Sequence, residues 1–175
     1  VEDVENAKLK TGGETKSDGD WTPLPASRVA LNARMQKSLA EIPQIHVTRQ
    51  MDVVPLTTKA EGITFTHRLI YAVAAVLVKH AALRTVINGS RVKIEPTSVA
   101  VAMDTPSGLV APVVRSAETL GLNQIAETIR DFRLRAERNA LRGEELRNGP
   151  FAITNLGMFG VDLFSAFVFH GQTAV

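Results

Sequence analysis

The sequence predicts an α/β fold, in which several helices pack against a mixed sheet of about five strands. Apolar residues recur at helical spacing in three long segments, 27–39, 66–83 and 123–141, and strand-like patterns lie between and after them. Hydrophobic residues make up 45% of the 175 residues, which is enough for one globular domain with a real core.

The N-terminal residues differ in composition from the rest of the chain. Residues 10–20, KTGGETKSDGD, contain three glycines and no large apolar side chain. Such a segment cannot bury enough apolar surface to offset its ordering entropy, so residues 9–20 are predicted to be a flexible linker. Residues 1–8 have a helix-like composition but are too few for a stable isolated helix. The packed domain, residues 21–175, is therefore expected to begin near Trp21.

Two helices and one strand are predicted in the first half of this domain. Ser27 can cap a helix that runs to about Leu39 and ends before Pro43. In QIHVTRQMDV, residues 44–53, apolar and polar side chains alternate, which predicts a strand with one wet or ligand-facing side. Residues 66–83 are apolar almost all round, so we expect a central, buried helix there.

Strands flank one further helix in the second half. SVAVAM (98–103) and GLVAPVV (108–114) are predicted strands, joined by the turn DTPSG. A long charged helix is expected over residues 123–141. An Asn-Gly-Pro loop then leads into a strand at 151–155, and FSAFVF (164–169) is the last strand candidate.

Composition excludes several classes of function. The 20 Lys and Arg nearly balance 18 Asp and Glu, so the net charge of +2 does not indicate nucleic-acid binding. The absence of cysteine excludes disulfides and thiolate chemistry, and the four histidines are not spaced as metal ligands. No phosphate-loop pattern is present. The apolar run 69–78 is too short to span a bilayer, and because the sequence begins with Val1 we expect a soluble intracellular chain whose natural N-terminal part is missing.

Five segments, in order, resemble the core domain of the dihydrolipoamide acyltransferases of 2-oxo acid dehydrogenase complexes. FAITNLGMFG (151–160) is the most specific, because the family reads very similarly there, usually with serine in place of Thr154. Residues 1–8 also resemble the end of the small subunit-binding domain that precedes the core. A chance helix-like composition explains these eight residues equally well. The other four segments are PLPASRVALNARM, IPQIHVTRQMDV, SVAVAMDTPSGLVAPVVRSAETLGL and the charged helix.

The resemblance implies a fold similar to chloramphenicol acetyltransferase. It implies trimers with active sites between neighbouring subunits, which assemble into large hollow cores. Coenzyme A would enter the site from one side, and a lipoyl group, attached to a separate domain, from the other. An acyl group would move between dihydrolipoamide and coenzyme A. The implied partners are identical subunits or a full-length acyltransferase, the lipoyl domain, and the dihydrolipoamide dehydrogenase and decarboxylase components.

Three residues are carried over as site candidates by this resemblance. Thr154 keeps the hydroxyl that donates to the developing oxyanion in the family, and its alternative role is to satisfy a local backbone group. Asn155 would lie near the coenzyme A arm, or would form a turn before Gly157. Asp104 is an acidic position near the coenzyme A site in some members, but we favour a turn-forming role for it.

The chain also departs from the family pattern. The D-H-R-x-x-D-G motif, which holds the histidine base, does not occur in these 175 residues, and the sequence around His170 does not replace it. Glu137 and Ala140 stand where the family has arginine and lysine. The segment 54–61 is shorter than usual, which removes part of a helix near the cofactor channel.

Two interpretations of these departures remain open. In the first, which we favour, the chain is a non-catalytic core subunit of a 2-oxo acid dehydrogenase complex, with pyruvate as the expected substrate of the complex. The family includes such a member, the dihydrolipoamide dehydrogenase-binding component, or component X, and this interpretation favours the mitochondrial matrix over a bacterial cytoplasm. In the second, the chain is a fragment of an active dihydrolipoamide acyltransferase.

Overall fold

The computed structural model describes residues 21–58, 60–88, 90–106 and 108–175. The described part of the chain contains three α-helices, α2 (Ala26–Glu41), α3 (Phe65–Lys79) and α4 (Leu122–Glu137), together with seven short strands. The mixed α/β architecture and the three helices confirm the predicted fold class. The proposed subunit-binding remnant (1–8) and the linker (9–20) lie outside the described residues.

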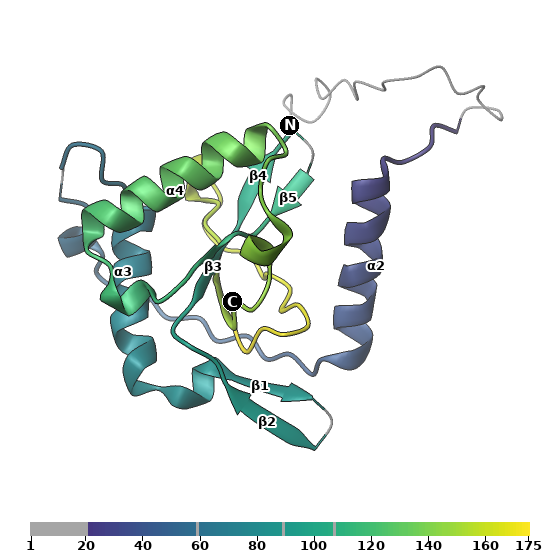
Figure 1. The fold of residues 1–175 in the computed structure, drawn as a ribbon, viewed down its shortest axis with the longest axis horizontal. Helices are drawn as coiled ribbons and strands as arrows, with labels where there is room; N and C mark the ends of the chain where they lie inside the picture. The colour runs from purple at the N-terminus through teal and green to yellow at the C-terminus, as the bar shows by residue number, and fades with distance from the viewer. Residues whose placement is uncertain (1–20, 59, 89, 107) are drawn as a thin grey trace.

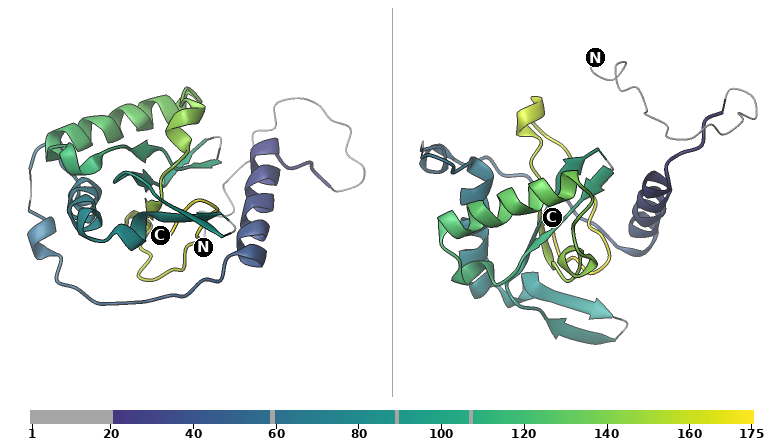
Figure 2. Two further views of the ribbon diagram at one scale, coloured as in Figure 1. Left: turned by 60° about the horizontal axis from the view of Figure 1, so that its bottom comes forward. Right: turned by 45° about the horizontal axis from the view of Figure 1, so that its top comes forward.

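A three-stranded mixed sheet forms the centre of the fold. Its order is β6 (Val113–Val114), β3 (Val99–Val101) and β7 (Phe151–Ile153). β3 runs antiparallel to β6 and parallel to β7. Helices α3 and α4 lie together beside this sheet, whereas α2 stands apart from them in every view (Figures 1 and 2).

Two hairpins extend from the central sheet. β4 (Met103–Thr105) pairs antiparallel with β5 (Gly108–Val110), which confirms the predicted strand–turn–strand unit. Gly108 has a φ of 111°, a conformation that L side chains rarely adopt, so glycine is needed there. The second hairpin, β1 (Thr85–Asn88) with β2 (Arg91–Ile94), was not predicted.

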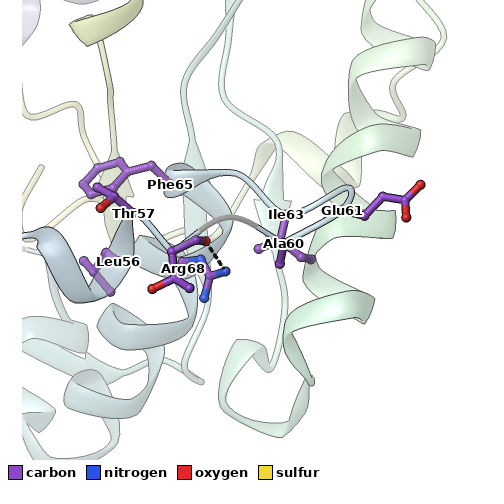
Figure 3. Close-up of a pocket in the computed structure, with 8 residues that line it drawn as sticks. Leu56, Thr57, Ala60, Glu61, Ile63, Phe65 and Arg68 are labelled. Atoms are coloured by element: carbon purple, nitrogen blue, oxygen red, sulfur yellow. Dashed lines mark hydrogen bonds between the residues drawn. The ribbon is translucent and has the colours of Figure 1, made fainter.

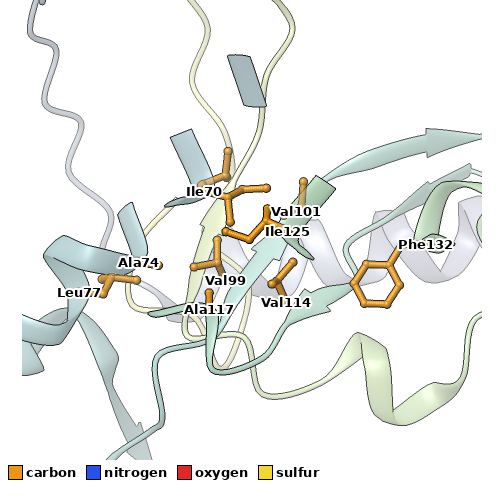
Figure 4. Close-up of a cluster of buried hydrophobic side chains, with 10 residues drawn as sticks. Ile70, Ala74, Leu77, Val99, Val101, Val114, Ala117, Ile125 and Phe132 are labelled. Carbon is orange, nitrogen blue, oxygen red and sulfur yellow. The ribbon is translucent and has the colours of Figure 1, made fainter. Parts of the chain in front are cut away.

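One hydrophobic core joins α3 and α4 to the central sheet (Figure 4). Ile70, Ala74 and Leu77 follow one another at helical spacing, so they share the face of α3 that meets the core. The opposite face, with Tyr71 and Val76, is exposed, so α3 is buried on one side only and not all round as the sequence suggested. The other members of the cluster are Val99, Val101, Val114, Ala117, Ile125, Phe132 and Ile153.

The strand predicted at 44–53 is wrong for the isolated chain. This segment is extended but forms no ladder with the described residues, and the side chains of Ile45 and Val47 are 89% and 86% exposed. A strand needs a neighbouring backbone to satisfy its N–H and C=O groups, and no described strand pairs with this segment. In Figure 1 it runs as a single line between α2 and the remaining fold.

The strand predicted at 164–169 is also wrong, because its backbone is bonded to side chains instead. The Ser38 hydroxyl donates to the Val168 carbonyl oxygen at 2.5 Å, and the Val168 N–H donates to Gln44 Oε1 at 3.2 Å. His170 Nε2 lies 3.1 Å from a carboxylate oxygen of Glu41. These contacts attach the segment to the end of α2.

Two helix ends differ from the prediction. Ser27 lies inside α2 and caps nothing, because the cap position is Pro25 and no side chain bonds the first turn. α4 ends at Glu137, earlier than expected, because Asn139 adopts a left-handed φ of 55°. The Ala140 N–H bonds the Arg135 carbonyl at 2.8 Å and the Asn139 N–H bonds the Ala136 carbonyl at 3.0 Å, a Schellman motif. No helix of the described residues is long and apolar enough to cross a bilayer.

Candidate functional site

A cavity of about 550 Å³ lies where the N-terminal end of α3 meets α4, β3 and β7. We call it the α3–α4 cavity. Such a volume lies in the range of small-molecule sites. Its walls are largely apolar, with residues from β3, α4 and β7 and the segment before α3. The polar side chains that line it are Thr64, Thr66, His67, Arg130, Arg133 and Asn155.

Asn155 is the site candidate that lines this cavity. Its Oδ1 accepts a hydrogen bond from the Gly157 N–H at 2.9 Å, the geometry of a turn-forming asparagine. Its Nδ2 donates to the Thr66 hydroxyl of α3 at 3.2 Å. The turn-forming role is therefore observed, and a role of Asn155 near coenzyme A stays a prediction.

Thr154 faces away from this cavity. Ile153 and Asn155 both line the α3–α4 cavity, but the residue between them does not. Successive side chains of extended backbone point to opposite sides, which explains the separation. The Thr154 side chain is half-buried and makes no hydrogen bond with the described residues. Its role as an oxyanion donor stays a prediction.

Asp104 is an exposed residue of strand β4, opposite Leu109 in the hairpin, and it does not line the α3–α4 cavity. The turn-forming role that we favoured for it is wrong. The turn begins one residue later, where the Thr105 hydroxyl donates to the Gly108 carbonyl oxygen at 2.6 Å. A role near coenzyme A stays a prediction.

His67 is a residue of this cavity that the sequence did not single out. Its Nδ1 accepts the Thr64 N–H at 3.1 Å, while the Thr64 hydroxyl accepts the His67 N–H at 3.4 Å, so the pair caps α3. A ring nitrogen that accepts carries no proton, so the neutral ring carries its proton on Nε2. Burial, and then the charge of Arg130, lower the pKa of His67, which keeps the ring neutral.

Arg130 and Arg133 supply the charge of the site. They lie one helical turn apart on α4, and neither forms an ion pair within the described residues. Acidic residues are interleaved with them along α4, a pattern typical of a solvated helix face, so the sequence alone does not single them out. Their i, i+3 spacing indicates that both lie on the same face of α4. Only the tertiary fold shows that α3 forms the opposite wall of the cavity.

A second hollow of about 550 Å³ lies beside the first and shares Ile63 with it. The short segment 54–61 forms one side of it, with a 3₁₀ turn at Val54–Leu56 (Figure 3). Its single arginine, Arg68, donates to the Thr58 carbonyl oxygen at 2.7 Å, and Glu61 adds a negative charge. These features suit an anion less well than the α3–α4 cavity does.

The other histidines are not assembled into a site. His46 and His80 are exposed, and His170 lies beside Glu41 at the end of α2. In the described part of the chain, no group of three or more His, Cys, Asp or Glu side chains could hold a metal ion. The α3–α4 cavity, in contrast, has hydrogen-bond donors and the cations Arg130 and Arg133 in its wall, and such a site can bind a ligand that carries hydrogen-bond acceptors.

The chain matches one protein family over most of its length. The profile of the family described as 2-oxoacid dehydrogenases acyltransferase (catalytic domain) matches residues 16–175. The chain is 31% identical over 166 residues to the dihydrolipoyllysine-residue acetyltransferase component of the acetoin cleaving system of Bacillus subtilis (strain 168), covering 87% of this chain and 42% of the relative. It is 30% identical to the acetyltransferase component of the mitochondrial pyruvate dehydrogenase complex of Schizosaccharomyces pombe, covering 97% of this chain and 38% of the relative.

A third relative differs in kind. The mitochondrial pyruvate dehydrogenase protein X component of Mus musculus is 26% identical, covering 93% of this chain and 34% of the relative. The chain thus spans about two fifths or less of the length of these three relatives.

Solved structures show the same fold. A probable dihydrolipoamide acetyltransferase from Listeria monocytogenes 4b F2365 superposes with a TM-score of 0.81 at 22% identity, covering 89% of this chain and 73% of that one. The dihydrolipoamide acetyltransferase (E2p) of Azotobacter vinelandii gives a TM-score of 0.79 at 21% identity, covering 93% and 75%. The predicted chloramphenicol-acetyltransferase-like fold is confirmed.

Proposed function

Because the chain belongs to the acyltransferase family of the 2-oxo acid dehydrogenase complexes, we propose that it is a core subunit of such a complex and that its task is assembly, not acyl transfer. The complex would act on pyruvate, and the subunit would work in the mitochondrial matrix. Its partners would be copies of itself or an active acyltransferase, with lipoyl domains and the dehydrogenase and decarboxylase components attached.

The exposed apolar face of segment 44–53 carries this proposal. Ile45, Val47 and Met51 alternate with polar residues, and all three are largely exposed in an extended backbone without a strand partner among the described residues. Apolar strand-like segments of this kind are covered by other chains in stable assemblies. A subunit of a multi-chain core would present such a face to its neighbour.

Three features outside the apolar face support a non-catalytic role. The segment 54–61, which opens with a 3₁₀ turn at Val54–Leu56, is shorter in sequence than in the family, where part of a helix lies near the cofactor channel. Glu137 and Ala140, in place of the family's arginine and lysine, are exposed at the end of α4. The similarity to protein X over 93% of this chain agrees with such a subunit.

The alternative is an active acyltransferase, and the retained Thr154–Asn155 pair supports it. A thiol that attacks a thioester needs a donor for the oxyanion, and the Thr154 hydroxyl can supply one. Coenzyme A and dihydrolipoamide would then be the substrates. Under this alternative a base must also take the proton of the attacking thiol, and the family motif that holds the histidine base does not occur in these 175 residues.

Two measurements on the purified chain separate these functions. Light scattering at micromolar concentration, with and without an active acyltransferase core, tests assembly. Thioester formation from dihydrolipoamide and acetyl-coenzyme A, with the active core as reference, tests chemistry. We expect association and only background acyl transfer. Turnover comparable to the reference would establish the alternative, and a monomer unchanged by the core would contradict the assembly role.

A further inference from the structure

We propose that the α3–α4 cavity is a binding site for a small monocarboxylate with an apolar body. The inference goes beyond the assembly role and does not depend on it. It rests on the chemistry of the cavity walls: two cations and neutral donors on one side, and aliphatic side chains on the other.

The cationic side of the cavity has no counter-charge. The lining residues of the cavity include Arg130 and Arg133 but no aspartate or glutamate. Neither arginine is ion-paired within the described residues, whereas Arg135 and Arg142 of the same region are each paired with carboxylates. A guanidinium binds a carboxylate through two parallel hydrogen bonds, so this pair is suited to one carboxylate.

His67 and Thr66 add neutral donors. His67 is 7% exposed, its Nδ1 is occupied by the Thr64 N–H, and Nε2 therefore carries the proton. Nε2 forms no hydrogen bond with the described residues. Every fully buried side-chain nitrogen and oxygen atom in this part of the chain has a hydrogen-bond partner, so Nε2 is not fully buried. The Nε2 atom is therefore open to the cavity that His67 lines. The Thr66 hydroxyl accepts from Asn155, which leaves its own proton free to donate.

The remaining walls select the body of the ligand. Ile63, Ile129, Ile153 and Met158 line the cavity with Val101 and Met103. A free phosphate would leave these apolar walls hydrated, and a neutral apolar molecule would leave the two arginines without an acceptor. A monocarboxylate with an apolar body satisfies both sides, because apolar contacts and a charge-assisted hydrogen bond then form together.

Isothermal titration of the whole chain with 4-methylpentanoate tests the proposal. The uncharged 4-methylpentanamide and inorganic phosphate serve as ligand controls. We expect 4-methylpentanoate to bind at least about tenfold more tightly than either control. The amide lacks the charge that pairs with the arginines, and phosphate lacks the apolar body that contacts the aliphatic walls. In NMR spectra the ring resonances of His67 should shift on addition of the acid and not of the amide.

Variants of the arginines locate the site. Arg130→Gln and Arg133→Gln should each weaken 4-methylpentanoate binding by about tenfold, while their circular dichroism spectra stay unchanged. Arg138→Gln makes the same chemical change on the same stretch of chain but lies outside the cavity, so it should bind normally. Equal weakening in Arg138→Gln, binding of the amide as tight as that of the acid, or preferential binding of phosphate would overturn the proposal.

Discussion

Glu145 is a buried carboxylate that joins α4 to the 3₁₀ turn η4 (Gly143–Leu146). Arg135 donates from Nη1 to Oε2 at 2.7 Å and from Nη2 to Oε1 at 2.9 Å, which makes a bidentate pair. The Arg142 backbone N–H donates to Oε2 at 2.8 Å, and its guanidinium donates to Oε1 at 3.0 Å. These donors, Arg135 first and Arg142 second, hold the pKa of Glu145 well below its ordinary value.

We predict that Glu145→Gln lowers the free energy of unfolding by roughly 1.5–3 kcal/mol at pH 7, because charge-assisted hydrogen bonds are lost in a buried place. The stabilisation depends on pH in a defined direction. Because the folded-state pKa lies below the unfolded value of 4.5, the stabilisation is complete above that value and is lost as the pH falls below it. Denaturant unfolding of both proteins at several pH values measures the difference.

The matched control for this prediction is Glu144→Gln. Glu144 pairs with Arg142 at 3.2 Å, but both side chains are about 70% exposed. Such a pair contributes little, so the free energy of unfolding should change by less than about 1 kcal/mol. Equal effects of the two substitutions would show that burial of Glu145 does not matter.

Thr154 has a prediction that separates its two possible roles. In any assembly containing this chain that transfers acyl groups at its Thr154 sites, Thr154→Ala should lower kcat by about 10²-fold through loss of an oxyanion donor. Thr154→Ser should keep the rate, because it keeps the hydroxyl. If Thr154→Ala leaves kcat unchanged, the hydroxyl is structural.

The sequence predicted only those residues of the site that belong to a local sequence motif. Asn155 was identified from FAITNLGMFG, and the Asx-type contact with Gly157 is a local interaction. His67, Arg130 and Arg133 were missed, because each has an ordinary local interpretation in its own helix. Only the packing of α3 against α4 brings them to one cavity.

At the scale of elements, prediction succeeded where the structure is stabilised locally or by a buried face. α3 and α4 follow the spacing of their apolar residues, and the β4–β5 hairpin follows its turn residues. The strands at 44–53 and 164–169 failed, because alternation states which face is apolar but does not supply a pairing neighbour. In the missed β1–β2 hairpin Asn88 pairs with Arg91, and the two residues between them in the sequence are Gly89-Ser90, a pair typical of two-residue hairpin loops that was overlooked.

The end of α4 gives a prediction at the scale of an element. Asn139 holds the left-handed position of the Schellman motif. Asn139→Gly should keep or slightly raise the free energy of unfolding, since glycine adopts this conformation without a Cβ clash. Asn139→Val should lower it by about 1–2 kcal/mol, because a β-branched residue is strained there. Thermal unfolding of the three proteins compares them, and equal stability of the valine variant would show that the turn can rearrange.

At the scale of the whole molecule, charge and apolar exposure both favour association. The net charge of +2 on 175 residues gives little mutual repulsion between copies. α2 and segment 44–53 stand away from the α3–α4 core in the views of Figures 1 and 2, and they carry large exposed apolar side chains such as Leu39, Ile45 and Val47. A surface of this kind is suited to burial against another chain.

The last prediction tests the apolar face of segment 44–53 by placing a negative charge either on that face or on the opposite, polar face. Val47→Glu should abolish association with itself or with an active acyltransferase core, because a carboxylate would be buried without a partner in the interface. The free energy of unfolding of the isolated chain should change by less than about 0.5 kcal/mol, since Val47 is 86% exposed there. Gln50→Glu introduces the same group on the polar side of the segment and should associate normally. If sedimentation shows that both variants associate like the unmodified chain, the apolar face of 44–53 is not the interface, and the assembly role loses the observation that supports it most.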